Sequence, residues 1–143
     1  MSQAEDEIRA LIDERIEAIR DKDPARAIAT LADDVVAFEL LPPLRMGADA
    51  VRNVNVFGLW LSGFETLDVG VRDLTIEADG NVGFAHALHH LVAKRMDGRS
   101  VSMWMRSTLG LRRGEDGWKI AHAHTSVPFT MEGGFRAAVK LEP

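Results

Sequence analysis

The 143-residue chain contains no cysteine and no tyrosine, although it has six phenylalanines and three tryptophans. Without cysteine, it can form no disulfide, no thiolate metal site and no thiol nucleophile. Without tyrosine, it has no phenol to donate a proton or a hydrogen bond in a site. No apolar run approaches the roughly 18 residues that indicate a membrane span, and the chain starts with acidic residues, unlike a signal peptide. We therefore expect a cytoplasmic protein that does not bind membranes.

Most of the net charge lies in the first segment of the chain. The net charge is −5, and residues 1–23 contribute −4 of it, with eight acidic against four basic side chains. A mildly acidic chain without a stripe of Lys and Arg is not typical of proteins that bind nucleic acids. Apolar residues make up 46% of the chain, enough to fill one core. Length and composition indicate a single domain over residues 1–143.

The first half of the sequence has helical periodicity. Apolar residues three and four apart predict an amphipathic helix over residues 3–22. Asp23-Pro24 is typical of an N-cap and the first residue of a helix, so we expect a short second helix that ends at Asp33-Asp34. A β-type run covers residues 35–40. A third helix is expected to run from Gly47 to Gly63.

The second half predicts consecutive antiparallel strands. Residues 66–78 alternate between apolar and polar side chains, and Asp-Gly dipeptides separate the segments that follow, 81–95, 101–113 and 118–127. Residues 82–94 also fit a helical stripe, but the turns at both ends favour a strand. After Pro128, a Gly133-Gly134 break precedes a tail that is expected to be partly helical. This order predicts an α+β domain with helices on one face of an antiparallel sheet.

The last long strand carries the richest group of polar side chains. Because side chains two residues apart share a face, one face is expected to carry Trp118, Ile120, His122, His124 and Ser126. This face begins apolar and ends polar, as expected for the wall of a cavity with a buried floor. The two imidazoles would act in acid–base chemistry or would be structural groups that bond to hydroxyls or backbone.

The preceding strand, 101–113, has two different faces. One carries Trp104, Arg106 and Thr108, and the other carries Met103, Met105 and Leu109. Polarity alone leaves open which face lines the cavity. An arginine in mid-strand is either a ligand-binding group or a surface residue paired with a carboxylate.

Three further histidines lie in the segment 81–95. On a strand, His86 and His90 share a face and His89 points away. His86 or His90 could line the cavity from a neighbouring strand, and half-buried or interface positions are the alternative.

Short motifs follow one another in a fixed order along nearly the whole chain. They are the acidic first helix, Leu31-Ala32-Asp33-Asp34, Pro42-Pro43 with Gly47, Arg106-Ser107-Thr108, Asp116-Gly117-Trp118-Lys119-Ile120, and the ending His122-x-His124-x-Ser126-x-Pro128-Phe129. Together they resemble the SnoaL-like division of the NTF2-like (ketosteroid isomerase-like) superfamily. The resemblance implies a cone-shaped α+β fold in which a curved antiparallel or mixed sheet wraps around the N-terminal helices. It further implies a pocket between helices and sheet, a homodimer through the outer sheet face, and a strand at residues 82–94.

The resemblance also assigns roles to residues. Glu39 follows Ala32-Asp33-Asp34 at the spacing where ketosteroid isomerases place their general base. Its apolar neighbours are expected to desolvate the carboxylate and raise its pKa. As a structural residue it would instead cap a strand or pair with Arg45 or Arg106. The predicted catalytic residues are Glu39, His122 and His124, and the predicted ligand-binding residues are Arg106, Thr108, Ser126, Trp60, Trp104, Phe38 and His90.

The expected function is cofactor-free acid–base chemistry, as in an isomerase or lyase. The reaction would be an isomerisation, dehydration or cyclisation next to a carbonyl of a small hydrophobic molecule. One alternative is a non-catalytic ligand-binding or association module. A second is a metal-dependent lyase or oxygenase with a two-histidine, one-carboxylate site of His122, His124 and Glu39. Ketosteroid isomerases stabilise their enolate with a tyrosine and a protonated acid, and this chain lacks the tyrosine, so His122, His124 or Arg106 would have to replace it.

Overall fold

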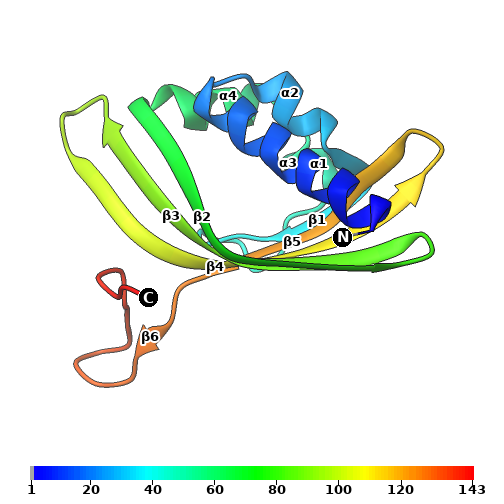
Figure 1. Cartoon of the computed structure of the whole chain (residues 1–143). Helices are drawn as coiled ribbons and strands as arrows, with labels where there is room; N and C mark the ends of the chain where they lie inside the picture. Colours follow the sequence, from blue (N-terminus) through cyan, green and yellow to red (C-terminus); the bar gives the residue numbers. More distant parts are fainter. Residues whose placement is uncertain (1) are drawn as a thin grey trace.

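The computed structural model describes residues 2–143 as one curved sheet with helices along its concave side (Figure 1). The helices are α1 (Gln3–Arg20), α2 (Pro24–Ala29), α3 (Ala48–Val51) and α4 (Val54–Ser62). The sheet contains β1 (Leu31–Phe38), β2 (Phe64–Asp79), β3 (Val82–Arg95), β4 (Ser100–Gly114) and β5 (Gly117–Ser126), in the order β1-β5-β4-β3-β2. β1 and β5 are parallel, and the other neighbours are antiparallel. The predicted α+β class with a curved, mixed sheet is confirmed, and residues 82–94 form a strand.

α1 is amphipathic, as its sequence predicts. Ile8, Ile12 and Ala18 are buried, and the Ser2 side chain caps the helix by accepting a hydrogen bond from the Glu5 amide. Acidic side chains in the first turn and Arg20 in the last turn complement the helix dipole. Among residues 2–143, no helix is both long and apolar enough to cross a bilayer.

The predicted boundaries around residues 30 and 53 are wrong. α2 ends at Ala29 and β1 already begins at Leu31, so Asp33 and Asp34 lie on the strand, where both are exposed. Burial of Leu31 in the core overrides the local helical pattern here. The expected helix over residues 47–63 is two helices, because the Asn53 side chain accepts hydrogen bonds from two amides and starts α4.

The tail is also different from the prediction. Instead of a partly helical segment, residues after Pro128 form a hairpin of two short strands, β6 (Phe129–Thr130) and β7 (Arg136–Ala137). Gly133 and Gly134 both have positive φ and form its turn.

Asp23 begins α2. Its carboxylate accepts a hydrogen bond of 3.2 Å from the Arg26 amide, and Pro24 follows as the first helical residue. Because loss of an N-cap typically costs about 1 kcal/mol, we expect Asp23→Ala to lower the free energy of unfolding by that amount in urea titrations. Asp13→Ala, at an exposed position inside α1, is the control. Equal losses in the two variants would contradict the capping role.

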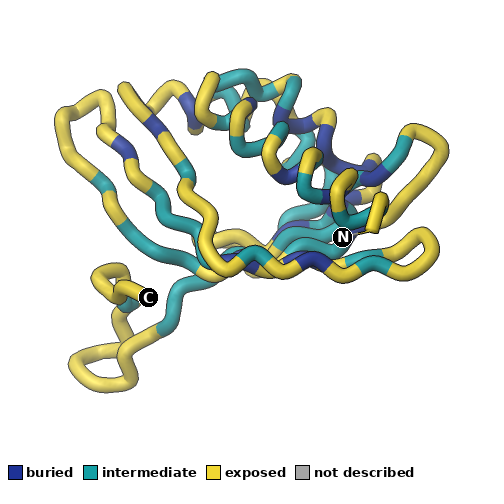
Figure 2. The backbone as a smooth tube through the Cα atoms, in the orientation of Figure 1, coloured by how far each residue is buried: buried dark blue, intermediate teal, exposed yellow. Residues whose placement is uncertain are grey.

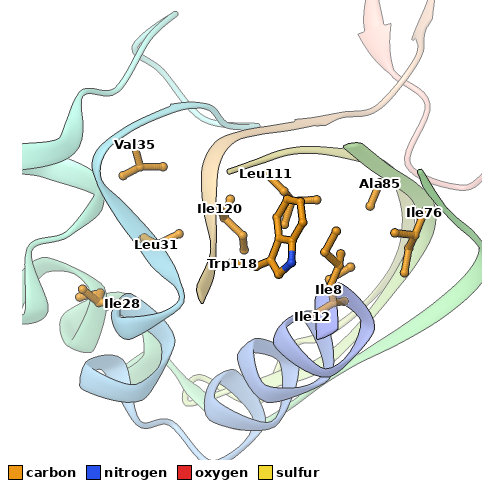
Figure 3. Packing of buried hydrophobic residues seen from close by; sticks show 10 residues of the cluster. All are labelled: Ile8, Ile12, Ile28, Leu31, Val35, Ile76, Ala85, Leu111, Trp118 and Ile120. Carbon is orange, nitrogen blue, oxygen red and sulfur yellow. The ribbon is translucent and has the colours of Figure 1, made fainter. Parts of the chain in front are cut away.

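The main core lies between α1 and the concave side of the sheet. Ile8 and Ile12 of α1 pack with Leu111, Trp118 and Ile120 of the strands (Figure 3). A second buried cluster at the end near α4 consists of Leu61, Phe64, Leu67 and Ala93. We call the sheet face that carries these side chains the inner face and the opposite one the outer face. Figure 2 shows that the buried residues concentrate between helices and sheet, while the C-terminal hairpin is exposed.

Candidate functional site

A β-bulge in β5 separates side chains that the sequence pattern places together. Leu111 of β4 pairs with Ile120, and Gly110 pairs with His122, so Ala121 is an extra residue. A bulge shifts the alternation of side chains by one residue. Ile120 therefore points into the core and His122 points to the outer face. A β-carbon on Gly110 would lie 3.3 Å from that of His122, which places both on the same side.

The expected single face of β5 is therefore wrong. Trp118 and Ile120 are buried in the core, whereas His122, His124 and Ser126 lie on the outer face. The bulge explains the difference, because one extra residue in a strand reverses every side chain that follows it. On the outer face, His122 donates a hydrogen bond of 2.7 Å from Nδ1 to the Val36 carbonyl.

The two histidines have an aromatic neighbour. The Phe38 ring packs edge-on against both imidazoles, with centroid distances of 4.7 Å to His122 and 5.3 Å to His124. Phe38 lies opposite His124 in the parallel β1–β5 pair. Ring packing against Phe38 thus involves both imidazoles, and a backbone hydrogen bond holds His122 as well.

β4 orients its polar residues outward as well. Ser107 and Leu111 are buried on the inner face, and Met103, Met105 and Leu109 share that face with them. Because side chains alternate along a strand, Trp104, Arg106 and Thr108 lie on the outer face. Arg106 Nε donates a hydrogen bond of 3.1 Å to Ser126 Oγ. The sequence left the orientation of this strand open, and the position of the core decides it.

His90 joins the outer face from β3. Its ring stacks on Trp104 at 4.5 Å between centroids and hydrogen-bonds to Ser102 Oγ at 2.9 Å. His86 lies on the same face beside Phe84, as the strand pattern predicts. Among the predicted ligand-binding residues, Trp60 alone is elsewhere, on α4, where it stacks on Phe57 at 6.0 Å.

Glu39 lies on the opposite side of the sheet from the two histidines. Ala37 is buried in the core and Phe38 faces outward, so Glu39, the next residue, faces inward. The side chain has access to solvent, but protein surrounds the carboxyl closely enough that burial raises its pKa. The positive charge of Arg15 acts in the other direction and lowers the pKa. The structure therefore does not bring Glu39 together with His122 and His124.

Arg15 is the inward-facing group that the sequence analysis missed. It lies three residues after Ile12 and four before Ile19, on the apolar stripe of α1 that faces the sheet. Burial lowers the pKa of its guanidinium, and the charge of Glu39 opposes this shift. A charged residue within an apolar helical stripe is a signal that the sequence already contained.

Only one nitrogen of the Arg15 guanidinium donates hydrogen bonds within residues 2–143. Nη1 donates to the Ala27 carbonyl at 2.9 Å and to Thr30 Oγ1 at 3.4 Å, and the group lies over the Phe57 ring at 5.9 Å. Within residues 2–143, Nε and Nη2 form no hydrogen bond, and no ion pair within 4.0 Å joins Arg15 to Glu39. The two charges thus influence each other without contact.

Two hydroxyl groups lie on the inner face of the strands that follow β1 in the sheet order. Phe38, the last residue of β1 before Glu39, lies opposite His124, and the next residue of β5, Thr125, pairs with Ser107 of β4. Met103 and Met105, both half-buried, extend the inner face away from these hydroxyls. The inner face at this end thus combines one carboxylate and two hydroxyls with apolar thioethers.

His89 is the histidine of β3 that faces inward, opposite Met105. Burial lowers its pKa, so the imidazole is neutral at pH 7. It lies on β3, three strands away from β1 in the sheet order. It is therefore a polar group of the inner wall at a distance from Glu39.

The alternative metal site does not assemble. Glu39 is on the inner face and both histidines are on the outer face, so this two-histidine, one-carboxylate set cannot share one ion. Among residues 2–143, no group of three or more His, Asp or Glu side chains is arranged to hold a metal.

A hollow in the surface lies elsewhere, at one end of β1. It measures about 260 Å³ and is lined by charged residues that include Asp33, Asp34, Arg112 and Lys119. Asp34 and Arg112 form an ion pair of 3.0 Å there, which lowers the pKa of Asp34. The hollow is lined by both acidic and basic side chains and contains none of the inward-facing groups described above.

Both the sequence and the fold match known proteins. The sequence model of the SnoaL-like domain matches residues 8–130. The chain belongs to the SnoaL-like family. No curated protein matches the chain significantly.

Solved structures show the same fold. An NTF2-like protein of unknown function from Pseudomonas putida KT2440 is 33% identical, with a TM-score of 0.86 over 100% of this chain and 99% of that chain. A proposed dehydratase of the NTF2-like family from Streptomyces avermitilis is 15% identical, with a TM-score of 0.76 over 87% of this chain and 97% of that one. A proposed ketosteroid isomerase from Shewanella frigidimarina NCIMB 400 is 20% identical, with a TM-score of 0.69 over 87% and 98%. This SnoaL-like chain therefore shares its architecture with proteins to which different reactions have been attributed.

Proposed function

We propose that this SnoaL-like protein is a cofactor-free acid–base enzyme that moves a proton next to the carbonyl group of a small hydrophobic molecule. The observation that carries the proposal is the pairing of Glu39 and Arg15 on the inner face, a carboxylate and a guanidinium that act on each other without contact. The dehydratase and ketosteroid isomerase proposed for two proteins of this fold belong to the same class of chemistry.

Glu39 is the base in this proposal. A general base works best when its pKa is close to the working pH, and burial moves the pKa of Glu39 in that direction. The carboxylate takes a proton from the carbon next to the carbonyl. The electron pair of that C–H bond then forms the enolate, whose charge develops on the carbonyl oxygen.

Arg15 is the electrostatic partner. Its free Nε and Nη2 atoms supply hydrogen bonds to the carbonyl oxygen as the enolate forms, in place of the tyrosine that the chain lacks. When the proton reaches Glu39, the negative charge moves from the carboxylate to the enolate oxygen beside Arg15. One negative charge therefore remains near the guanidinium throughout the step, which avoids an uncompensated buried charge.

The product depends on where the proton goes next. If Glu39 returns it to another carbon of the conjugated system, a double bond moves and the reaction is an isomerisation. If Glu39 instead gives it to a hydroxyl group on the β-carbon, water leaves and the reaction is a dehydration. The apolar wall with Met103 and Met105 favours a substrate that is hydrophobic apart from these oxygens.

The proposal is tested by deuterium incorporation. Small hydrophobic ketones and β-hydroxy ketones are incubated with the protein in D₂O, and exchange at the α-carbon is measured by NMR and mass spectrometry. We expect exchange that depends on the protein and persists after dialysis against EDTA. Compounds that bind, as detected by native mass spectrometry, without any exchange would support the binding-module alternative. Loss of exchange after EDTA treatment would support the metal-dependent alternative.

A further inference from the structure

Two polar side chains of the inner face have no hydrogen-bond partner among residues 2–143. Ser107 of β4 is only 6% exposed, and His89 of β3 is half-buried. Ser107 pairs with Ala87, and His89 lies two residues further along β3, so the hydroxyl and the imidazole are diagonal neighbours on one face. On the outer face of the same strands, His90 and Ser102 bond to each other. Because buried polar groups are nearly always hydrogen-bonded, His89 and Ser107 need a partner from another molecule.

The two side chains line the same small cavity beneath α1. Its volume is about 10 Å³, close to the minimum that one water molecule occupies. Ile12 of α1, which points toward the sheet in Figure 3, and Leu74 and Leu109 of the strands supply apolar walls. The cavity therefore has the room and the polar partners for one oxygen atom in an otherwise apolar surrounding.

The chemistry of the pair favours an uncharged hydroxyl group. Burial lowers the pKa of His89, so its neutral imidazole has one donor and one acceptor nitrogen. The Ser107 hydroxyl can also donate and accept. A ligand hydroxyl satisfies both side chains at once by accepting from one and donating to the other. None of the described residues that line the cavity is Lys or Arg, so a carboxylate would be buried there without a balancing charge.

The cavity lies near the residues of the proposed reaction. Ile12 and Arg15 are three residues apart on the same stripe of α1, which corresponds to about 4.5 Å along the helix axis. Met105, opposite His89, extends the apolar wall on the same face of the sheet. A substrate whose carbonyl oxygen binds Arg15 can therefore reach the cavity with a second oxygen at its other end.

We infer that His89 and Ser107 form a second polar subsite, which binds a hydroxyl group of the substrate at the end remote from the reacting carbonyl. The substrate class is then a hydrophobic ketone with a distant hydroxyl. The inference rests on the proposed function for the placement of the carbonyl at Arg15. In it, His89 and Ser107 determine specificity and carry no proton of the reaction.

Matched ketones test the subsite by NMR titration of the whole protein. Linear methyl ketones of increasing chain length are each compared with the derivative that carries a hydroxyl on the last carbon. For at least one chain length, we expect the Kd of the hydroxy ketone to be about tenfold lower, the upper range for a hydrogen bond between neutral groups. The ¹⁵N resonances of the His89 ring should shift with the hydroxy ketone and not with its parent. If no chain length shows a preference, the pair holds only a structural water and the inference is wrong.

Variants of the pair show whether the preference belongs to this cavity. In His89→Leu with Ser107→Ala, the two matched ketones are expected to have equal Kd values. Apolar groups of similar size replace polar groups without partners, so the variant should fold like the wild type in circular dichroism. Ser107→Ala alone should lose part of the preference, and His89→Gln, whose amide donates and accepts, should keep part of it. The matched control, Ser102→Ala, removes an outer-face hydroxyl of β4 and should keep the full preference. A preference that survives in the double variant overturns the inference.

Binding and exchange together separate the subsite from the proposed reaction. A preference for the hydroxy ketones without deuterium exchange at the α-carbon would support the subsite and contradict the reaction. Exchange without any preference would overturn the subsite and leave the roles of Glu39 and Arg15 in place.

Discussion

Replacing Glu39 with Gln is expected to slow α-carbon exchange at least about 100-fold, the lower end of the typical contribution of a general base. The amide has nearly the shape of the carboxyl group but cannot accept the proton. Exchange is measured in D₂O with the substrate that gives the highest rate with the wild-type protein. The control is Glu77→Gln, which removes an exposed carboxylate on β2 far along the sheet.

The same substitution is expected to raise stability at pH 7. The folded-state pKa of Glu39 is raised above its unfolded value, so between the two pKa values the folded state holds a proton that the unfolded state has lost. Stability therefore falls as the pH rises through this window, and the full penalty is present above the folded pKa. Glu39→Gln removes the penalty, so its melting temperature should be higher than that of the wild type at pH 7 and should converge with it at acidic pH. A variant that remains active would contradict the role of Glu39 as the base, and one that melts below the wild type at pH 7 would contradict the burial of its charge.

Replacing Arg15 with Met is expected to reduce exchange about 100-fold or more, which is the usual effect of removing one donor to an oxyanion. The linear thioether fills the space of the arginine stem on the apolar stripe of α1. It cannot donate hydrogen bonds to the developing enolate. Arg15→Lys keeps the charge but loses the planar fork of donors, so we expect an intermediate rate.

Two further measurements distinguish catalysis from a structural role of Arg15. The guanidinium is desolvated, and the Ala27 carbonyl retains a 2.6 Å hydrogen bond from the Thr30 hydroxyl, so Arg15→Met should reduce the free energy of unfolding only at pH values at which Glu39 is ionised and loses its compensating charge. Because Arg15 lowers the pKa of Glu39, the variant should raise that pKa, as read by ¹³C NMR of the Glu39 carboxyl. Arg20→Met, which removes an exposed arginine paired with Asp68, is the control. An unchanged exchange rate with an unchanged Glu39 pKa would remove Arg15 from the site.

Local patterns in the sequence determined much of the fold. The apolar spacing of residues 3–22, the Asp23-Pro24 cap and the Asp-Gly turns depend on neighbouring residues, and each is present in the structure. The position of Glu39 among apolar residues also predicted the direction of its pKa shift, since desolvation follows from the surroundings that the chain folds around it. The inward position of Arg15 could also have been predicted from the sequence, because it is a charged residue at an apolar position of the helical pattern.

The tertiary structure alone decided which side chains meet. One extra residue, Ala121, turns His122 and His124 to the outer face. The residue types of β5 do not predict this bulge, because bulges arise from pairing with another strand. The orientation of Arg106 follows from the core beneath Leu109 and Leu111, which joins segments far apart in the chain. In the proposed function, Arg15 of α1 supplies the hydrogen bonds that the missing tyrosine cannot. Composition and periodicity thus determined the elements and the available chemistry, whereas strand pairing and packing determined the site, because only these bring distant residues together.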